Sequence, residues 1–342
     1  MKSYPHHSDA VQTIHAECPA IDLHADPLLW TKFVGYDLNK KHKAPLPHAW
    51  FGGHVDVPRL IEGGLGAQFF GLVSLPVLDA DLGAAIDQQI DFLRAACDRS
   101  DGRLKLVTSA EAFLKQSQHG VAALLGIEGA HCLEGSLSRL EHFAARGVRY
   151  LGLLHFSANA CGFPAMGFGV NHEQGLTNFG CSVIESCEQQ GVIVDLAHIN
   201  KKGFMQACSI AQKPMYVSHT AVSGVHSMWR NIDDEQLRAV ADNGGAVGVI
   251  FCPAYLGQDG IPAVVEHLKH IIKVGGESLP ALGSDWDGFI RPTQGLEDAS
   301  KLPHLTQALL DAGMTHALVQ KILQRNALRV LQDVPEKQSA IL

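Results

Sequence analysis

Eight short apolar segments, separated by polar loops and amphipathic helical stretches, restrict the fold of this 342-residue chain more than any other feature. Strands that alternate with helices in this way are typical of βαβ units, which build a parallel sheet. The predicted strands span 20–24, 66–74, 121–127, 148–154, 192–196, 214–218, 245–251 and 279–285. This number of strands is typical of a closed barrel.

Helical periodicity fills the intervals between these segments. The predicted helices span 55–63, 81–98, 136–146, 177–190, 201–212, 233–242, 261–273 and 303–313, with a further C-terminal helix at about 315–332. An open doubly wound sheet usually has fewer strands and a glycine-rich first turn, whereas the first strand here continues into Asp-Leu-His-Ala-Asp-Pro. We therefore expect an α/β fold of the (β/α)₈ TIM-barrel class, of the metallo-dependent hydrolase type.

The chain is expected to form a single catalytic domain over residues 1–342, because barrels of this length are common as one domain. One stretch, at about 27–54, breaks the rhythm and is rich in aromatic residues. We predict an irregular loop insertion there, which could form one wall of a substrate pocket over the barrel mouth.

Composition narrows the class of function. A net charge of −8 with 46% hydrophobic residues indicates a globular protein without the basic surface that nucleic acid or anionic lipid would need. The first twenty residues contain no apolar run typical of a secretory signal, and no stretch is long and apolar enough to span a membrane. The eight scattered cysteines are expected to be reduced thiols. We predict a cytoplasmic enzyme that acts on a small molecule and that forms a homodimer if it oligomerises.

Titratable side chains follow most of the predicted strands. Catalytic residues of such barrels come from the carboxyl ends of several strands, so side chains at these positions should converge on one small volume. A lone histidine after an apolar strand is more often structural, but this many at equivalent positions indicate a site. They are His24, Asp26, Glu128, His155, His198, His219 and Asp285.

The residue types in this set favour metal ions of the zinc type, since imidazole and carboxylate ligands are present and thiolates are absent. A carboxylate can bridge two cations through its two oxygens, and Glu128 is the natural bridge. Two bridged cations can activate a water near neutral pH and polarise a carbonyl group. The sequence therefore predicts two Zn²⁺ ions per chain.

The order of these motifs resembles the membrane (renal) dipeptidase family, the M19 peptidases of the amidohydrolase superfamily. The similar stretches run in order over about residues 20–330: IDLHADP, HVDVPRLIEGGLGAQFFG, LLGIEGAHCL, VRYLGLLHFSAN, VDLAHIN, PMYVSHTAV, RNIDDE and ALGSDWDG. The resemblance implies a metallo-dipeptidase that hydrolyses free dipeptides, with tolerance of a D-residue at the C-terminal position.

The resemblance also implies a role for each matching residue. His24 and Asp26 would hold one zinc, His198 and His219 the other, and Glu128 would bridge them. In the same way, His155 would contact the scissile carbonyl oxygen, Arg230 would bind the substrate carboxylate, and Asp285 would take the proton of the attacking water.

Two other classes of function compete with this interpretation. Another amidohydrolase reaction, on a lactone or an N-acyl amino acid for example, would usually show His-x-His on the first strand, where this chain has His24-Ala25-Asp26. A non-catalytic metal-binding barrel would be expected to lack the residues at positions 155, 230 and 285. The roles of His131 and Asp287 stay open, and so do the preferred dipeptide side chains.

Overall fold

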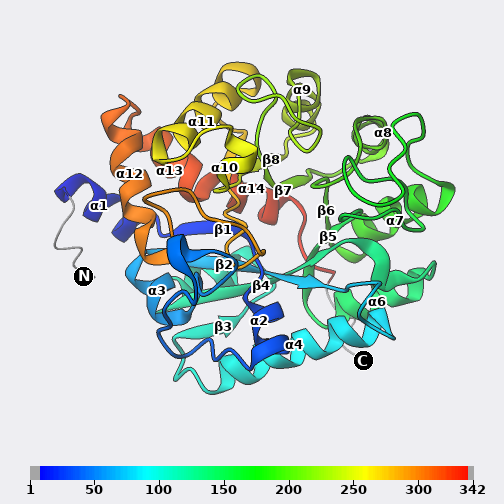
Figure 1. The fold of residues 1–342 in the computed structure, drawn as a ribbon, viewed down its shortest axis with the longest axis horizontal. Helices are drawn as coiled ribbons and strands as arrows, with labels where there is room; N and C mark the ends of the chain where they lie inside the picture. The colour runs from blue at the N-terminus through cyan, green and yellow to red at the C-terminus, as the bar shows by residue number, and fades with distance from the viewer. Residues whose placement is uncertain (1–7, 338–342) are drawn as a thin grey trace.

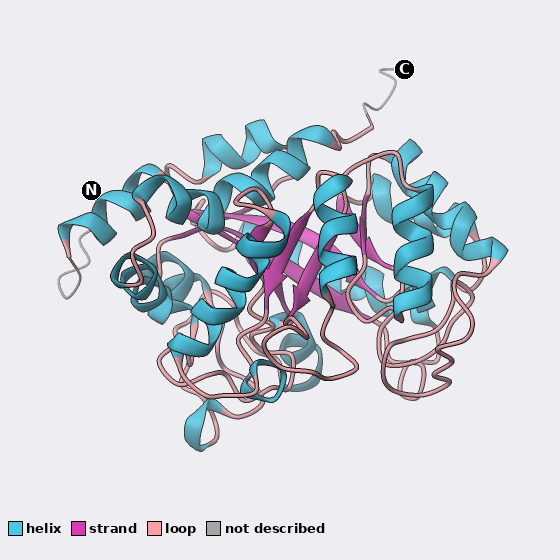
Figure 2. Cartoon of the chain, turned by 90° about the horizontal axis from the view of Figure 1, so that it is seen from above, coloured by secondary structure: helices cyan, strands magenta, loops and turns pink. Residues whose placement is uncertain are grey.

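The computed structural model describes residues 8–337 and shows a closed parallel barrel surrounded by helices (Figure 1). In Figure 2 the strands occupy the middle of the molecule, helices surround them, and most of the loops lie toward the lower edge of the view. The predicted (β/α)₈ fold is confirmed.

Eight strands close the barrel through parallel pairing of neighbours, with the ring completed by the pairs β2–β4 and β1–β9. They are β1 (Ala20–Ala25), β2 (Leu65–Val73), β4 (Val121–Glu128), β5 (Val148–Gly152), β6 (Ile193–Asp195), β7 (Tyr216–Thr220), β8 (Ala246–Val249) and β9 (Pro280–Leu282). A further short strand, β3 (Leu104–Leu106), pairs in parallel with the start of β4. Each of the eight predicted strands is present, and β3 was not predicted.

The helices pack around the barrel and at its ends. They are α1 (Asp9–Glu17), α2 (Pro27–Val34), α3 (Val57–Glu62), α4 (Leu82–Asp98), α5 (Ala110–Gln116), α6 (Leu137–Ala145), α7 (Asn178–Gln190), α8 (Lys201–Ile210), α9 (Asp234–Asp242), α10 (Pro253–Leu256), α11 (Ile261–Gly275), α12 (Leu302–Asp311), α13 (His316–Gln320) and α14 (Asn326–Asp333). The predicted C-terminal helix is present as α13 and α14, joined by a π-helical turn over Lys321–Arg325.

The barrel interior is filled by aromatic rings below the carboxyl ends of the strands. Phe69, Tyr150 and Tyr216 are fully buried, and their ring centroids lie 5.1–6.4 Å apart. Gly126 on β4 leaves room for one of these rings, because a Cβ at this position would lie 2.0 Å from Cζ of Tyr150. The hydroxyl of Tyr216 donates to the carbonyl of Ala327, which ties α14 to the floor of the barrel. The interior is a packed core on which the loops above can be positioned.

The segment 27–54 differs from the prediction, because its first part is helical. Pro27 occupies the first turn of α2 and Gly35 ends the helix in the left-handed conformation with φ of 68°. Proline suits the first turn because it has no N–H to leave unpaired, and glycine tolerates a positive φ at the end of a helix. The remainder, after Gly35, contains only a short 3₁₀ turn at Pro47–Ala49. The expected irregular insertion is therefore confined to about residues 35–54.

Two further expectations concern the whole chain. All eight cysteines are free, as predicted. Within residues 8–337 no helix combines the length and the apolar character that a membrane span requires.

Candidate active site

The predicted site residues converge at the carboxyl ends of the barrel strands. His24 lies on β1, Glu128 ends β4, His219 lies on β7, and the remaining residues follow β1, β5, β6 and β9. Three groups of three side chains place their ligand atoms within 4.8 Å of one another: His24 with Asp26 and Glu128, Glu128 with His155 and His198, and His24 with His219 and Asp285. All seven predicted side chains are thus brought together.

The first pair owes its geometry to the end of β1. His24 and Asp26 are two residues apart, so both side chains point to the same face, and Nε2 of His24 lies 3.4 Å from Oδ2 of Asp26. Asp26 directly precedes α2, yet its carboxylate makes no capping hydrogen bond to that helix. On the neighbouring strand a Cβ at Gly71 would lie 1.9 Å from Oδ1 of Asp26, so only glycine leaves room for this carboxylate.

Glu128 stands at the centre of the cluster. Its Oε1 lies 2.9 Å from Nε2 of His198, 3.3 Å from Nε2 of His219 and 3.6 Å from Nε2 of His24. Its Oε2 lies 3.5 Å from Nε2 of His155. One carboxylate therefore faces four imidazoles, which is the position that a bridging ligand requires.

The combined effect of burial and neighbouring charges lowers the pKa values of two histidines and of the central carboxyl group in this site. Burial lowers the pKa of His198 and His219 well below the usual range, and the charge of Arg230 acts in the same direction. Both rings are therefore neutral, which is the form that binds a metal ion. Burial opposes ionisation of Glu128, but His155 and His24 outweigh it and hold the pKa of this carboxyl well below its usual range.

The donor set fits a pair of divalent cations. Nε2 of His24 and Oδ1 of Asp26 are buried and have no hydrogen-bond partner within residues 8–337. Buried polar atoms are rarely left unpaired in native proteins, so these atoms indicate a missing cationic partner. Imidazole nitrogens and carboxylate oxygens without thiolates are ligands that zinc accepts.

Asp285 and Arg230 line the same cavity as the metal-type ligands, and this cavity has a volume of about 50 Å³. Oδ1 of Asp285 lies 3.8 Å from Nε2 of His24. Burial raises the pKa of the Asp285 carboxyl well above its usual range, and the negative charges of Asp26 and Glu128 raise it further. His155 lines the cavity too, and its side chain is 18% exposed.

Arg230 is buried on the loop after β7 and is tied to the strand that carries His219. Its Nη2 donates to the carbonyl of His219 at 2.8 Å, while Nε has no hydrogen-bond partner within the described part of the chain. Its guanidinium carbon lies 6.0 Å from the ring centroid of Tyr255. The guanidinium therefore has a fixed position beside the cluster and keeps donor capacity for an anion.

Sequence reasoning missed several residues that line this cavity. They are Phe156, Tyr255, Gly288 and Ile290. Gly288 is required by a close approach, since a Cβ there would lie 2.2 Å from Oδ1 of Asp285. Phe156 follows His155 directly and could have been found by extending the motif by one residue. Tyr255 lies in the short helix α10, and Gly288 and Ile290 lie in the loop after β9, where no periodicity points to the site.

The structure places His131 and Asp287 outside the cluster. Nε2 of His131 lies 2.9 Å from Oγ of Ser157, so this ring contacts the loop after β5. The carboxylate of Asp287 accepts the backbone N–H groups of His54 and Val55, both at 2.9 Å. Asp287 therefore holds the end of the 35–54 segment against the loop after β9.

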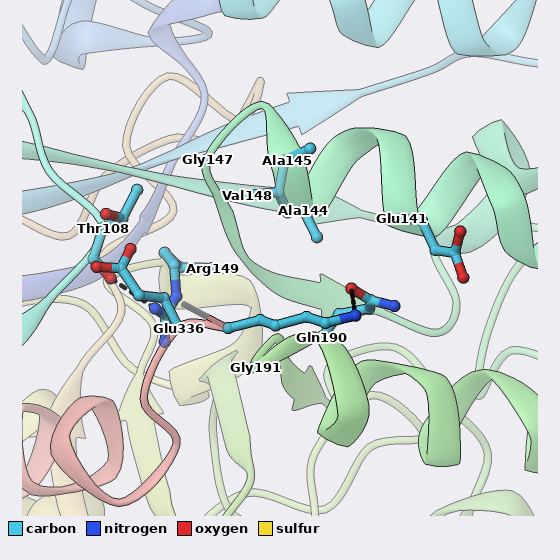
Figure 3. A pocket seen from close by; sticks show the side chains of 11 residues that line it. Thr108, Glu141, Ala144, Ala145, Gly147, Val148, Arg149, Gln190, Gly191 and Glu336 are labelled. Atoms are coloured by element: carbon cyan, nitrogen blue, oxygen red, sulfur yellow. Dashed lines mark hydrogen bonds between the residues drawn. The ribbon is translucent and has the colours of Figure 1, made fainter. Parts of the chain in front are cut away.

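A separate hollow of about 310 Å³ lies at the amino ends of β5 and β6, opposite the site (Figure 3). Arg149 in its wall donates to the carbonyls of Thr108 and Val334, each at 2.6 Å. None of the metal-type groups found in the described residues includes a side chain from this hollow. The reactive groups that the sequence predicts therefore gather at the carboxyl end of the barrel.

Comparison with known proteins gives a family match over almost the whole chain. The model of the membrane dipeptidase family, peptidase family M19, matches residues 8–341. Dipeptidase tcpJ of Claviceps purpurea is 33% identical over 298 residues, which cover 83% of this chain and 70% of that protein. Dipeptidase 3 of Mus musculus is 34% identical over 294 residues, 83% of this chain but only 58% of the mouse protein.

A solved structure agrees with this match. The metallopeptidase from Rhodobacter sphaeroides, solved with a phosphinate mimic of the dipeptide L-Ala-D-Ala, superposes with a TM-score of 0.81 at 25% identity and covers 93% of this chain and 99% of that one. With a family match that spans the barrel and the candidate site alike, the chain belongs to the membrane dipeptidase family, peptidase family M19, and is a metallo-dipeptidase.

Proposed function

We propose that this protein is a binuclear zinc dipeptidase that hydrolyses the peptide bond of free dipeptides. The observation that carries the proposal is the position of Glu128, which faces four imidazoles and lines one cavity with Asp285 and Arg230. His24 and Asp26, which group with Glu128, would hold one zinc ion. His198 and His219, whose Nε2 atoms lie 2.9 Å apart, would hold the other, and Glu128 would bridge the two ions. Bound zinc would lower the pKa of a water molecule and polarise the scissile carbonyl.

In this proposal the remaining polar groups of the cavity bind the substrate and move the proton. His155 reaches the cavity from the loop after β5 and would donate an N–H to the carbonyl oxygen as negative charge develops there. Asp285 would accept the proton of the attacking water and pass it to the leaving amine. Its carboxyl is suited to this role because burial raises its pKa, so it holds a proton more readily than an exposed carboxyl does.

Arg230 would restrict the enzyme to short substrates. A planar guanidinium pairs with a terminal carboxylate, whereas a continuing peptide chain offers only a neutral amide. The hydrogen bond from Arg230 to the carbonyl of His219 fixes the guanidinium close to the proposed metal ligands. The distance between peptide bond and terminal carboxylate would then be limited to that of a dipeptide.

We also propose that dipeptides with a C-terminal D-residue are substrates. The Rhodobacter sphaeroides relative was solved with a mimic of L-Ala-D-Ala, which supports the proposal for this chain. Tolerance of either configuration is reasonable if recognition depends on the peptide carbonyl, the amine and the carboxylate. A panel of L,L and L,D dipeptides tests it, and turnover of L,L dipeptides alone would contradict it.

The metal stoichiometry provides one prediction. Elemental analysis of the purified protein should find about two divalent ions per chain, and Glu128→Ala should lose most of this metal together with the activity. A single ion that survives Glu128→Ala with full activity would contradict the binuclear proposal.

The proposed pairing of Arg230 with the substrate carboxylate provides a second prediction. Wild-type enzyme should cleave free dipeptides far better than the same peptides amidated at the C-terminus. Arg230→Lys should lower kcat/KM for free dipeptides by on the order of 2 kcal/mol, about 30-fold, because the bidentate pair is lost. Metal content should not change. Equal losses for free and amidated substrates would show that Arg230 supports the fold of the site instead.

A lactone or an N-acyl amino acid in the same assay tests the rival amidohydrolase reactions. A cytoplasmic location and a homodimer remain predictions from the sequence.

A further inference from the structure

The imidazole of His219 is held from the side opposite its proposed metal-binding nitrogen. Its Nδ1 lies 2.9 Å from Oγ of Ser218, and this hydroxyl lies 2.8 Å from Oδ2 of Asp195 at the end of β6. All three side chains are buried, with Asp195 and His219 1% exposed and Ser218 0% exposed. A buried carboxylate, a hydroxyl and an imidazole therefore form one continuous chain of hydrogen bonds.

The direction of these hydrogen bonds follows from the number of protons. Oδ1 of Asp195 accepts two backbone N–H groups, from Ser218 at 2.7 Å and from Ala197 at 3.2 Å. In the ionised carboxylate Oδ2 is an acceptor as well, so the single hydroxyl proton of Ser218 points to Asp195. The hydroxyl oxygen can then only accept from His219, which places the ring proton on Nδ1. Nε2 is left with a free lone pair that faces Glu128 and His198, at 3.3 and 2.9 Å.

We propose that Asp195 and Ser218 are positioning residues of the metal centre, which set the tautomer and the orientation of His219. The inference rests on the proposed function, since it assumes that His219 is a metal ligand. Ligating histidines usually donate their other ring N–H to a carboxylate, a carbonyl or a water. Here the carboxylate acts through a serine hydroxyl that comes from the same strand as the ligand.

The imidazoles of the other two proposed histidine ligands are held differently. Nδ1 of His24 lies 2.7 Å from the hydroxyl of Tyr150, and Nδ1 of His198 has no hydrogen-bond partner within the described residues. Among the three proposed histidine ligands, only His219 therefore has its imidazole in contact with the Asp195–Ser218 pair. Changes to this pair should alter one ligand of the site while the others stay in place.

The chain contains a matched pair that serves as a control. Asp22 on β1 accepts from Oγ of Ser284 at 2.6 Å and from the backbone N–H of Ser284 at 2.8 Å, and both residues are buried. The chemistry is that of Asp195 and Ser218. The hydroxyl of Ser284, however, contacts the carbonyl of His24 and the N–H of Trp286, and no imidazole nitrogen.

The decisive variant is Asp195→Asn, because it reverses the hydrogen-bond chain without a change of shape. Oδ1 of the asparagine keeps the backbone N–H groups, while the amide nitrogen takes the place of Oδ2 and donates to Ser218. The hydroxyl proton then turns to Nδ1 of His219 and drives the ring proton to Nε2, where it competes with a metal ion.

The experiment measures zinc affinity of chelator-stripped protein by competition with a chromophoric chelator. Asp195→Asn should weaken the affinity by about 10–100-fold, the range found for partners of metal ligands, while Asp22→Asn should not. Asp195→Asn/Ser218→Ala should bind zinc more tightly than Asp195→Asn alone, because the reversed donor is removed. ¹⁵N NMR of histidine should show the proton of His219 on Nδ1 in the wild type and on Nε2 in metal-free Asp195→Asn.

Each outcome separates this inference from the proposed function. Equal losses in Asp195→Asn and Asp22→Asn, or a double variant as weak as Asp195→Asn, would reduce the pair to a structural role and overturn the inference. Wild-type affinity in Asp195→Asn would overturn it as well. Failure of the wild type to bind zinc would instead contradict the proposed function.

Discussion

Asp285 combines an unusual backbone conformation with an unusual environment. Its φ is 60°, a left-handed value that is uncommon for residues other than glycine, and its N–H donates to the carbonyl of His24 at 3.1 Å. The next turn adapts to it, since Gly288 donates its N–H to the carbonyl of Asp285. Strained conformations cost free energy and persist where the surroundings enforce them, often at functional sites. The carboxylate of Asp285 is thereby held toward the cavity among the proposed metal ligands.

If Asp285 is the general base, Asp285→Asn should retain both metal ions and lose most of its turnover. Asparagine has nearly the same shape but cannot accept the proton of the attacking water, and general bases typically contribute about 10²–10⁴ in rate. Steady-state kinetics with elemental analysis of the same sample checks this prediction. Turnover close to the wild-type value would assign the proton transfer to another group.

At the scale of elements, the strand ends were the most predictable part of this protein. His24, Glu128, His155, His198 and Asp285 follow or end apolar segments, and the barrel geometry brings such positions together whatever the loops do. Both the fold and the candidate site could therefore be predicted from the equivalent positions of these residues at the strand ends.

Elements and contacts set by tertiary structure could not be predicted in this way. The proline directly after Asp26 is compatible with a turn, so the sequence alone does not indicate that α2 is helical. The helix is stabilised by its packing over the barrel. The contact of Ser218 with Asp195 joins residues 23 positions apart, and no periodicity indicates it. Polar residues inside apolar strands, such as Asp22 and Asp195, were the only available signal for these buried partners.

The packing of α11 against neighbouring loops leads to a prediction on acid stability. His267 on this helix is fully buried, accepts the N–H of Val222 at Nδ1 and donates from Nε2 to the carbonyl of Leu256. Burial lowers the pKa of His267 below 6.5 in the folded protein. The unfolded chain therefore binds a proton first as the pH falls, so the stability from the neutral ring is complete above about pH 6.5 and is lost below it.

His267→Gln should remove this proton linkage. Urea unfolding at about pH 7.5 and 5.5 should show a smaller loss of unfolding free energy in the variant than in the wild type, although the variant is less stable at the higher pH because it loses packing and a hydrogen bond. Parallel pH dependence in the two proteins would mean that His267 does not titrate between the folded and unfolded states. Asp234→Asn removes the carboxylate of a partly buried ion pair with His270 on the same helix and leaves His267 unchanged, so its pH dependence provides a comparison.

For the whole molecule, the apolar core lies below the site, and the hydroxyl of Tyr150 contacts Nδ1 of His24 where the two meet. The aromatic rings of the barrel interior and the contact of Tyr216 with α14 lie below the strand ends, whereas the titratable cluster lies above them. The core should therefore hold the barrel together without assistance from the site. In the site, carboxylate oxygens of Asp26, Glu128 and Asp285 all lie within 3.8 Å of Nε2 of His24. Negative charges gathered in this way repel each other unless cations or protons compensate them.

Removal of metal should accordingly lower thermal stability while the secondary structure persists. Chelator-treated protein is expected to keep its far-UV circular dichroism spectrum, because the core does not depend on the ligands, but to melt at a lower temperature. Zinc at 100 times its dissociation constant should restore about 2.7 kcal/mol per site, since it binds the folded state alone. Glu128→Gln should lose most of this zinc-dependent rise in Tm, as it removes the proposed bridge and one negative charge. A zinc-independent Tm in the wild type would contradict a metal site at this cluster, and an unfolded metal-free protein would show that the barrel depends on the metal for its fold.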